Sequence, residues 1–368
     1  MSSGRLRCSL PAQMETVTQT YRIAVDCMGG DKGPGEVVQA VSLALKELGA
    51  GDKLFLVGQE EVLRPLLRSA GIAGDARIEV RHAPDVIEMD DKPMQAMKSK
   101  KHSSMIVALE MLKAGEADAV VSTGNTKVLV GAGTLKVRLM PGVQRPALSA
   151  IFPRKTGYSI VVDVGANPET TSEQLVHNTV LGALYSISIL GTEKPKVGLL
   201  TVGTEEGKGG ERINRANAYL KALNEHFDWF EYAGPVEGFD VFQGDADVIV
   251  TDGFTGNILL KTVEGLVYML KDLIGEKVKR NPIYIAAGLV LLPLLKAVKR
   301  QVRPERFGGA PLLGLNGLVF KAHGSSNKHG TAAAILMARN ACSKNINRKA
   351  SELLAAANDV VAEVQESL

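Results

Sequence analysis

The sequence predicts an α/β protein in which helices cover both faces of a largely parallel sheet. Two observations support this fold class. Short apolar runs rich in β-branched residues alternate with amphipathic segments of helical period through most of the chain. Five of these runs lead directly into short loops of glycine, hydroxyl and amide residues. In α/β proteins the loops at the carboxyl ends of parallel strands bind ligands, so we expect these loops to line one crevice.

Length and composition set the class of protein. At 368 residues the chain can bury a large core, in one large α/β domain or in two smaller ones. A net charge of +3 is close to neutral, so the overall charge predicts no nucleic-acid partner. The three cysteines have no paired spacing, which indicates a reduced, cytoplasmic setting.

The expected strands are short apolar runs that end in glycine or small polar residues. A polar segment, residues 1–20, comes before them. It lacks the apolar core of a signal peptide and is expected to be a disordered N-terminal extension. In chain order, the expected strands are 22–26, 54–57, 78–80, 118–121, 159–162, 197–200, 248–250 and 317–320.

The expected helices repeat apolar residues at positions that share one face. The helix over 36–48, for example, follows a glycine-rich turn at 28–35 and places Val37, Val41 and Leu45 at helical spacing. The other helices that the pattern defines clearly are 60–70, 103–114 and a long helix that begins at about residue 256.

The loops after five of the strands share one chemistry. Glycine lets backbone N–H groups approach a ligand, and serine, threonine and asparagine add donors, as an oxyanion or phosphate site requires. The loops are Ser-Thr-Gly-Asn-Thr at 122–126, Asp-Val-Gly-Ala-Asn at 163–167, Thr-Val-Gly-Thr-Glu-Glu-Gly-Lys at 201–208, Thr-Asp-Gly-Phe-Thr-Gly-Asn at 251–257 and His-Gly-Ser-Ser at 323–326.

Several familiar site motifs do not occur in the sequence. It has no Walker phosphate loop, no dinucleotide-binding glycine motif after a strand, no metal-ligand spacing of histidine and cysteine, and no Gly-x-Ser-x-Gly elbow. Asp26 and Asp31 could hold a divalent cation, but orienting the glycine-rich turn is the role that we favour. We therefore expect no cofactor, no metal, and a reaction in which a bound anion itself attacks.

A second feature is the uncharged apolar stretch 283–295, which has basic residues on both sides. It is shorter than the about 20 residues that span a bilayer. The pattern fits an apolar tip that enters a membrane surface while the cations meet anionic headgroups. A buried core helix or a dimer contact is the alternative. The expected membrane contacts are Leu289, Leu291, Leu292 and Leu294.

Together, these motifs resemble a known family. The stretch Ile-Ala-Val-Asp-Cys-Met-Gly-Gly-Asp-Lys-Gly-Pro at 23–34 and the five loops, in this order, are similar to those of the bacterial phosphate acyltransferases of the PlsX family. The resemblance covers about residues 21–340. Cys27 and Lys32 depart from the family pattern, where alanine and histidine are expected, and the second departure puts any role of that histidine in doubt.

The resemblance implies a fold, a reaction and partners. The fold would be the three-layer α/β/α arrangement of the isocitrate and isopropylmalate dehydrogenases, shared with phosphotransacetylases. The enzyme would transfer a long acyl chain from acyl carrier protein to inorganic phosphate, and the acyl phosphate would feed a membrane glycerol-3-phosphate acyltransferase in phospholipid synthesis. It would be a cytoplasmic homodimer, peripherally associated with the inner face of the cell membrane. Residues 21–345 would form the catalytic domain, with 277–306 as a membrane-facing insert and 346–368 as a C-terminal helix.

The reaction suggests roles for particular residues. Phosphate is already nucleophilic, so the site must neutralise it, align it with the thioester and stabilise an oxyanion. Lys208 is the candidate for that charge, Asn257 for a hydrogen-bond donor, and His323 for protonating the leaving thiolate or binding phosphate. A solvated lysine, a helix N-cap and a structural histidine are the respective alternatives. The expected phosphate- or substrate-binding residues are Ser122, Gly124, Asn125, Thr126, Asn167, Thr204, Gly256 and Ser325.

Other assignments stay open at this point. Asp163 and Asp252 are expected to organise loops rather than to act as bases. The basic residues within 277–306 fit either an acidic carrier protein or a lipid surface. Two rival functions are a phosphotransacetylase-type enzyme that uses short acyl-CoA and a non-catalytic membrane scaffold. The apolar stretch argues against the first, and the intact polar loops argue against the second.

Overall fold

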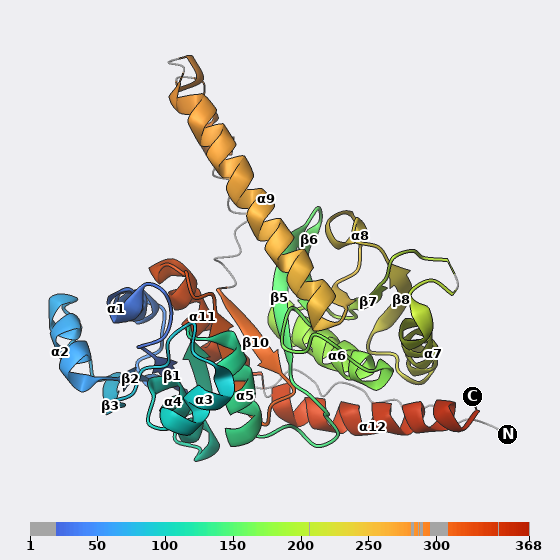
Figure 1. Ribbon diagram of the computed structural model, residues 1–368, viewed down its shortest axis with the longest axis horizontal. Helices are drawn as coiled ribbons and strands as arrows, with labels where there is room; N and C mark the ends of the chain where they lie inside the picture. The colour runs from blue at the N-terminus through green and yellow to red at the C-terminus, as the bar shows by residue number, and fades with distance from the viewer. Residues whose placement is uncertain are drawn as a thin grey trace.

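The computed structural model describes residues 20–205, 207–280, 283–285, 287, 290–294, 308–344 and 346–367. Within them, an eleven-stranded sheet has the order β3-β2-β1-β4-β11-β10-β5-β6-β9-β7-β8, and helices lie on both sides of it (Figure 1). The predicted α/β class with a largely parallel sheet is confirmed. The strands are β1 (Arg22–Asp26), β2 (Lys53–Gly58), β3 (Ile78–His82), β4 (Ala119–Ser122), β5 (Ala147–Arg154), β6 (Gly157–Val162), β7 (Lys196–Leu200), β8 (Glu231–Val236), β9 (Val248–Val250), β10 (Gly309–Leu313) and β11 (Leu318–Ala322).

Successive side chains along a strand point to opposite faces of the sheet, and so they build two apolar cores, one on each face. On β1, Ile23 and Val25 pack in one core while Ala24 packs in the other. Because both faces are covered, the central strands read as continuous apolar runs. The first core is closed by α1 (Gly33–Ala44), α2 (Glu60–Ser69), α6 (Ser172–Tyr185) with the π-helix η1 (Ser186–Leu190), α7 (Gly210–His226), α11 (Lys328–Cys342) and α12 (Ile346–Ser367). The second is closed by α3 (Pro93–Ser99), α4 (Ser104–Lys113), α5 (Thr126–Lys136), α8 (Asp240–Gln243) and the start of α9 (Gly253–Lys279).

Two sets of parallel strands run in opposite directions along this sheet. One set is β3-β2-β1-β4-β11 and the other is β6-β9-β7-β8. The antiparallel pairings β11–β10, β10–β5 and β5–β6 separate them. Each antiparallel pairing reverses the strand direction, so an odd number of them leaves the two sets opposed. The five predicted loops therefore do not all leave the sheet along one strand direction.

The sequence pattern did not define β5 and β10, the strands that join the two sets. Each contains a proline, Pro153 in β5 and Pro311 in β10. Proline cannot donate to a ladder, so it weakens a prediction of strand. Here Pro153 pairs with Tyr158 in the β5–β6 hairpin and Pro311 pairs with Phe320 of β11. Pairing with β11 and with β5, which lies far along the chain, decides the conformation of β10.

Two helices begin earlier than their apolar spacing predicts. α1 begins at Gly33 rather than at residue 36, because Pro34 in the first turn presets φ where no N–H partner is needed. α9 begins at Gly253 rather than at about residue 256, because the Asp252 carboxylate accepts the Thr255 N–H at 2.8 Å and caps the helix. Polar and proline signals, rather than apolar ones, set these boundaries.

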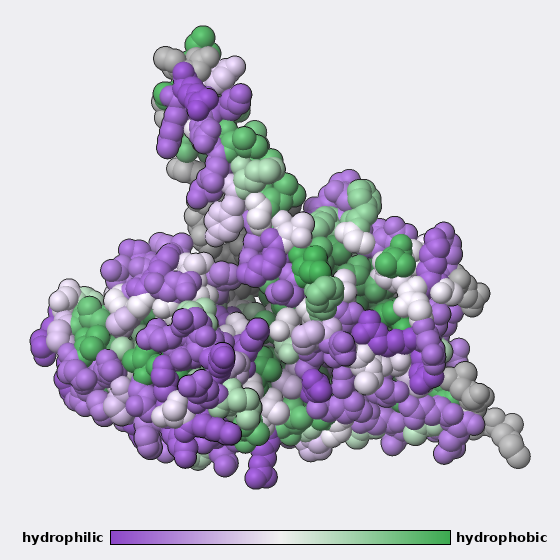
Figure 2. All heavy atoms as spheres, in the orientation of Figure 1, coloured by the Kyte–Doolittle hydropathy of each residue, from purple (hydrophilic) through white to green (hydrophobic). Residues whose placement is uncertain are grey.

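The helix α9 projects from the body of the molecule (Figure 1). Apolar side chains are exposed along it, for example Ile274 at 60%, and Figure 2 shows exposed apolar surface on the projecting helix. No helix in the part of the chain that the structure describes is long and apolar enough to cross a bilayer. Leu289 lies outside the described residues, whereas exposure rules out a place in this chain's own core for Leu291 (48%), Leu292 (39%) and Leu294 (59%).

Candidate active site

Three loops meet at the carboxyl ends of β1, β4 and β11. The strand register places Asp26, Ser122 and Lys321 side by side, and paired residues of neighbouring strands share a face. The Asp26 carboxylate accepts hydrogen bonds from Ser122 Oγ and from Ser104 Oγ of α4, both at 2.6 Å. All four side chains are buried. This polar row fixes the ends of three strands directly beneath their loops.

The three loops pack backbone against backbone. A Cβ on Gly29 would lie 2.7 Å from Gly124 Cα, so the turn after β1 approaches the loop after β4 only because glycine stands there. Thr123 Oγ1 donates to the Gly29 carbonyl at 2.8 Å. The Asp31 N–H donates to the Gly324 carbonyl at 2.9 Å, which adds the loop after β11. The three loops thus form one unit, which we call the first loop cluster.

The Asp26 carboxylate acts on the backbone of the glycine-rich turn. Asp26 Oδ1 accepts the N–H groups of Met28 and Gly29, both at 3.3 Å, which agrees with the predicted role of orienting the turn. Among the described residues, no group of three or more histidine, cysteine, aspartate or glutamate side chains is placed to hold a metal ion.

Lys321 is the buried cation of the first loop cluster. Its side chain is 6% exposed, and Nζ donates to the carbonyl of Thr123 at 3.3 Å and to the carbonyl of Ala322. Burial lowers the pKa of the Lys321 ammonium to about 8, although Asp26 and Asp31 favour its charged form. The ammonium ties the loop after β4 to the end of β11.

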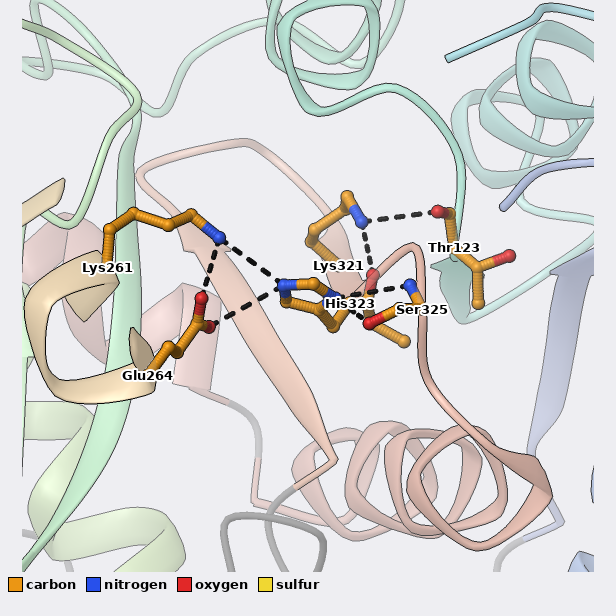
Figure 3. A network of polar contacts seen from close by, with 7 residues as sticks. Thr123, Lys261, Glu264, Lys321, His323 and Ser325 are labelled. Carbon is orange, nitrogen blue, oxygen red and sulfur yellow. Dashed lines mark hydrogen bonds and ion pairs between the residues drawn. The ribbon is translucent and has the colours of Figure 1, made fainter. Parts of the chain in front are cut away.

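His323 lies between its own loop and α9 (Figure 3). Ser325 directs its hydroxyl and its backbone N–H at His323 Nδ1, at 2.8 and 3.2 Å. On the other side of the ring, Glu264 Oε1 of α9 is 3.5 Å from Nε2. Lys261 Nζ lies 3.4 Å from Nε2 and 2.8 Å from Glu264 Oε2. The structure thus joins two residues of the sequence-based list, His323 and Ser325, with two that the list lacked.

Glu264 is the carboxylate of this group. Contact with His323, together with the hydrogen bond from Lys261, lowers the pKa of Glu264 to about 2, against partial burial that acts in the opposite direction. The carboxylate is therefore ionised at neutral pH and faces both Lys261 and His323. An ionised carboxylate on one side of a histidine and a hydroxyl on the other is an arrangement that can accept and deliver a proton.

A second loop cluster lies at the ends of β6 and β9. Asp163 is fully buried, and its carboxylate accepts the backbone N–H groups of Leu148, Gly165, Ala166 and Asn167. Burial raises the pKa of Asp163, and these hydrogen bonds oppose the rise. The loop is closed onto the start of α9 by the N–H of Gly253, which donates to the Asn167 carbonyl at 2.8 Å. Asp163 therefore organises its loop, as the sequence analysis expects.

Asp252 joins α9 to α7 in the same cluster. Its carboxylate caps α9 and pairs with Arg212 Nη2 at 2.7 Å. Burial alone would raise the pKa of Asp252, but the Thr255 N–H and the Arg212 guanidinium lower it. Asp252 is therefore also a loop organiser.

Lys208 lies in the loop after β7, and Asn257 lies in the first turns of α9, so both belong to the second parallel set. Lys208 is exposed and pairs with Glu205 at 3.0 Å. Asn257 is exposed within α9 and faces Gly165, on which a Cβ would lie 3.3 Å from Asn257 Oδ1. The alternative assignment of Asn257 as a helix N-cap is wrong, because Asp252 caps the helix.

Two predicted phosphate-binding amides are engaged within the protein. Asn125 caps α5 through Oδ1, which accepts the N–H groups of Lys127 and Val128, and its Nδ2 donates to the carbonyls of Met89 and Asp91. Asn167 Nδ2 donates to Pro146 O at 2.5 Å and to Asp163 Oδ2 at 3.0 Å. We interpret both amides as part of the loop architecture.

The other predicted binding residues divide into packed and accessible ones. The Gly124 N–H donates to Ser122 Oγ, and the Ser122 hydroxyl donates to Asp26. Gly124 and Ser122 therefore stabilise the ends of the strands. Gly256 permits close packing, since a Cβ there would lie 1.9 Å from the Asp163 carbonyl oxygen. Thr204 and Ser325 are exposed and Thr126 is partly exposed, so these three stay the accessible candidates.

Lys261, Glu264 and Lys321 are the site residues that sequence reasoning missed. Lys261 and Glu264 are three positions apart on a helix, a spacing that is usually a solvated surface pair. Lys321 had a usable signal, because a lysine inside the apolar run Leu-Val-Phe-Lys-Ala stands where lysine is rarely buried without a reason.

The sequence is similar to those of known proteins over most of its length. A family model described as "Fatty acid synthesis protein" matches residues 21–349. A phosphate acyltransferase of Halorhodospira halophila is 41% identical over 319 residues, covering 87% of this chain and 92% of that protein. One from Methylococcus capsulatus is 40% identical over 330 residues, covering 90% and 96%.

Solved structures agree on the fold. The EutD phosphotransacetylase of Staphylococcus aureus matches with a TM-score of 0.55 at 18% identity, over 88% of this chain and 94% of that one. A branched-chain phosphotransacylase of Enterococcus faecalis matches with a TM-score of 0.56 at 16% identity, over 88% and 100%. At this level of identity the likeness concerns the fold alone, and it supports the α/β class expected from the sequence.

Proposed function

The chain belongs to the phosphate acyltransferase family, and we propose that this acyltransferase moves a long acyl chain from acyl carrier protein to inorganic phosphate. The products are acyl phosphate and the free thiol of the carrier protein. The observation that supports the site assignment most strongly is the place of His323, between Ser325 and the α9 carboxylate of Glu264.

The proposed reaction needs no covalent nucleophile from the protein. An oxygen of hydrogen phosphate attacks the thioester carbonyl, the new C–O bond forms, and the C–S bond breaks. The proton that phosphate loses is the proton that the leaving thiolate gains, so the reaction balances without a redox partner. The enzyme has to hold the two substrates together and to stabilise the charge of the tetrahedral intermediate.

His323 is proposed to carry that proton. Its Nδ1 accepts the Ser325 hydroxyl, so a proton released by phosphate can pass through this hydroxyl to the ring and then to the thiolate. The His323 side chain is 50% exposed, which leaves it open to substrates. Proton transfer by a positioned side chain typically contributes about 10²–10⁴-fold in rate.

Lys208 is proposed to supply the positive charge. It is flanked by Gly207 and Gly209, which have φ of +87° and +103°, so its loop follows a path that favours glycine. Its present partner is Glu205, and both side chains are more than half exposed, at 52% and 65%. Exposed ion pairs are weak, so little is lost when Lys208 exchanges Glu205 for phosphate. Asn257 adds a donor from the first turns of α9.

The α9 region is proposed to bind the membrane surface and the partner proteins. Lys277 and Lys279 end this helix, and exposed apolar side chains such as Leu291 follow them. A long-chain acyl phosphate is poorly soluble in water, so its release at a membrane surface brings it to a membrane glycerol-3-phosphate acyltransferase. An acidic carrier protein fits the same cations. We further propose a cytoplasmic homodimer at the inner face of the cell membrane, in which a second copy covers part of the apolar surface of α9.

Donor comparison tests this function. Purified protein is given phosphate with either long-chain acyl carrier protein or short-chain acyl-CoA, and released thiol and acyl phosphate are measured. We expect turnover with the carrier-protein thioester and poor turnover with acyl-CoA. A preference for short acyl-CoA would support a phosphotransacetylase-type enzyme instead, and no acyl phosphate from any donor would support a scaffold.

One observation favours a second chemical route. Ser325 Oγ is 2.8 Å from His323 Nδ1, and Glu264 lies behind the ring, as in enzymes with an activated serine nucleophile. The variant Ser325→Ala separates the routes. Direct attack by phosphate predicts that Ser325→Ala keeps part of the activity, because water can take the place of the relay hydroxyl, whereas an acyl-serine route predicts near-complete loss.

A further inference from the structure

We propose that Glu264 of α9 is a positioning residue that holds the His323 ring in the state able to accept a proton at Nδ1. The inference rests on the proposed function, in which His323 moves the proton between phosphate and thiolate. Glu264 acts on the ring from the side opposite Ser325 (Figure 3). It therefore adds to the reaction a residue from a different element of the fold.

The hydrogen bonds around His323 assign its tautomer. A backbone N–H can only donate, and the Ser325 N–H lies 3.2 Å from Nδ1, so Nδ1 is an acceptor in the neutral ring. The ring hydrogen then sits on Nε2, which faces Glu264 Oε1 at 3.5 Å. A carboxylate on that side stabilises this tautomer and the doubly protonated ring that forms during turnover.

Lys261 makes the carboxylate necessary. Its Nζ lies 3.4 Å from Nε2, and an ammonium can only donate, so on its own it favours a bare Nε2 with the hydrogen on Nδ1. That tautomer points a ring hydrogen at the Ser325 N–H. Glu264 Oε2 accepts from Lys261 Nζ at 2.8 Å and so directs the ammonium away from this role. Without the carboxylate, Lys261 would compete for Nε2 and would also repel a protonated ring.

Placement on α9 makes Glu264 a connection between the two parallel strand sets. The start of α9 is fixed to the second loop cluster by Asp252 and Gly253, whereas His323 belongs to the first loop cluster. Val263, the neighbour of Glu264, packs against the apolar core on that face of the sheet. Glu264 therefore presents its carboxylate from a helix with a fixed origin, as a positioning residue requires.

A double-mutant cycle tests the proposal with long-chain acyl carrier protein and phosphate as substrates. The variants are Glu264→Gln, His323→Ala and the pair together. Glu264→Gln should lower kcat by about 10–100-fold while the KM for phosphate changes little, because an orienting partner is lost rather than a binding contact. In the His323→Ala background the same change should add less than about a twofold loss. Additive losses would overturn the proposal, and so would a Glu264→Gln variant with wild-type kcat.

Two further variants sharpen the test. Lys261→Met combined with Glu264→Gln should recover part of the activity that Glu264→Gln loses, because the competitor for Nε2 is gone. No recovery would overturn the tautomer argument. Glu110→Gln is the matched control, since Glu110 also pairs with a lysine on the surface, Lys136 at 2.6 Å, and should keep wild-type kinetics.

Failure of this inference and failure of the proposed function give different results. An active His323→Ala variant would remove His323 from the reaction and Glu264 with it. An inactive His323→Ala variant with an additive Glu264→Gln loss would remove Glu264 alone. Thermal unfolding of each variant checks the fold. Should Glu264→Gln not fold, Glu264→Asp enters the same cycle, and it should again add nothing in the His323→Ala background.

Discussion

Lys208 lies in a surface loop and pairs with Glu205 at 3.0 Å. Because this lysine holds no core, Lys208→Ala should leave the fold intact. Loss of one preorganised charge near an oxyanion typically costs about 10²–10³ in rate, and we expect a fall in kcat of that size. Steady-state kinetics and thermal unfolding measure the two effects. Lys221→Ala, at an exposed position of α7, is the matched control, and near-normal activity of Lys208→Ala would remove Lys208 from the site.

Lys321 should make stability depend on alkaline pH. Its pKa is about 8 in the folded protein and near the ordinary value of 10.5 in the unfolded chain. Between these values the folded state binds fewer protons, so stability rises with pH; below pH 8 the cost of burying the charge is fully present. The gain in free energy of unfolding across this window is at most about 3 kcal/mol. Urea unfolding of the wild type and Lys321→Met at pH 7 and pH 9.5 measures it, and a stability difference that does not change with pH would contradict the account.

Sequence reasoning located single residues unevenly. His323 and Ser325 stand in a glycine-containing loop directly after a strand, and that local signal was enough to select both. The sequence around Glu264 gives no sign of a site residue. Its proposed role arises because α9, which begins beside the second strand set, runs past the loop that carries His323. Asn125 and Asn167 show the converse: their amides resemble ligand donors in the sequence, but in the structure they bond to backbone and carboxylate groups of the protein itself.

At the scale of elements, two glycines of α9 offer a matched comparison. Gly256→Ala should destabilise the protein by about 1–3 kcal/mol or more, because its Cβ would lie 1.9 Å from the Asp163 carbonyl oxygen and would force the helix off the loop. Gly275→Ala meets nothing within 4 Å and should be neutral or stabilising by up to about 1 kcal/mol. Urea unfolding compares them. Equal stability of the two variants would show that α9 does not need this close approach.

The apolar tip provides a second test at the element scale. Leu291 and Leu292 are 48% and 39% exposed, so replacing both with glutamate should leave the protein folded. Each leucine that becomes buried in lipid contributes about 1.5–3 kcal/mol, so the double variant should bind anionic vesicles at least about 100-fold more weakly. Activity on soluble substrates should persist. Leu135→Glu, at a 64% exposed position of α5, is the control.

Vesicle sedimentation separates the outcomes of that test. A folded double variant that binds vesicles as well as the wild type would show that the apolar tip is not the anchor. An unfolded one would show that this stretch packs in a core, for example against a second copy.

Elements with a strong apolar period were predicted well, and those defined by polar contacts were not. The helix α2 and the strand β9 lie close to the expected positions, since local apolar spacing is sufficient for both. The strands β5 and β10 were not predicted, because each contains a proline, which is uncommon in strands, and because their conformation depends on the strands with which they pair. The start of α9 was not predicted either, because the Asp252 cap, not the apolar pattern, sets the first turn.

For the whole molecule, the prediction that all five loops lie along one edge of the sheet needs correction, whereas the prediction that they line one crevice stays a prediction. The loops were expected along one edge of a parallel sheet, but β10 and β5 reverse the strand direction between the two parallel sets. The loop contacts consequently fall into two clusters, with α9 reaching from one to the other through Glu264 and His323. Strand order is a long-range property, and no short motif reports it.

The measurement that tests the central claim most directly is the dependence of thiol release on phosphate. Long-chain acyl carrier protein is mixed with the enzyme, with and without phosphate, and thiol, acyl phosphate and enzyme-bound acyl groups are followed by rapid quench and mass spectrometry. The account predicts no thiol release without phosphate, one acyl phosphate for each thiol with it, and no acyl group on any side chain, Ser325 and Cys27 included. A burst of thiol without phosphate, together with an acylated protein residue, would contradict direct transfer to phosphate.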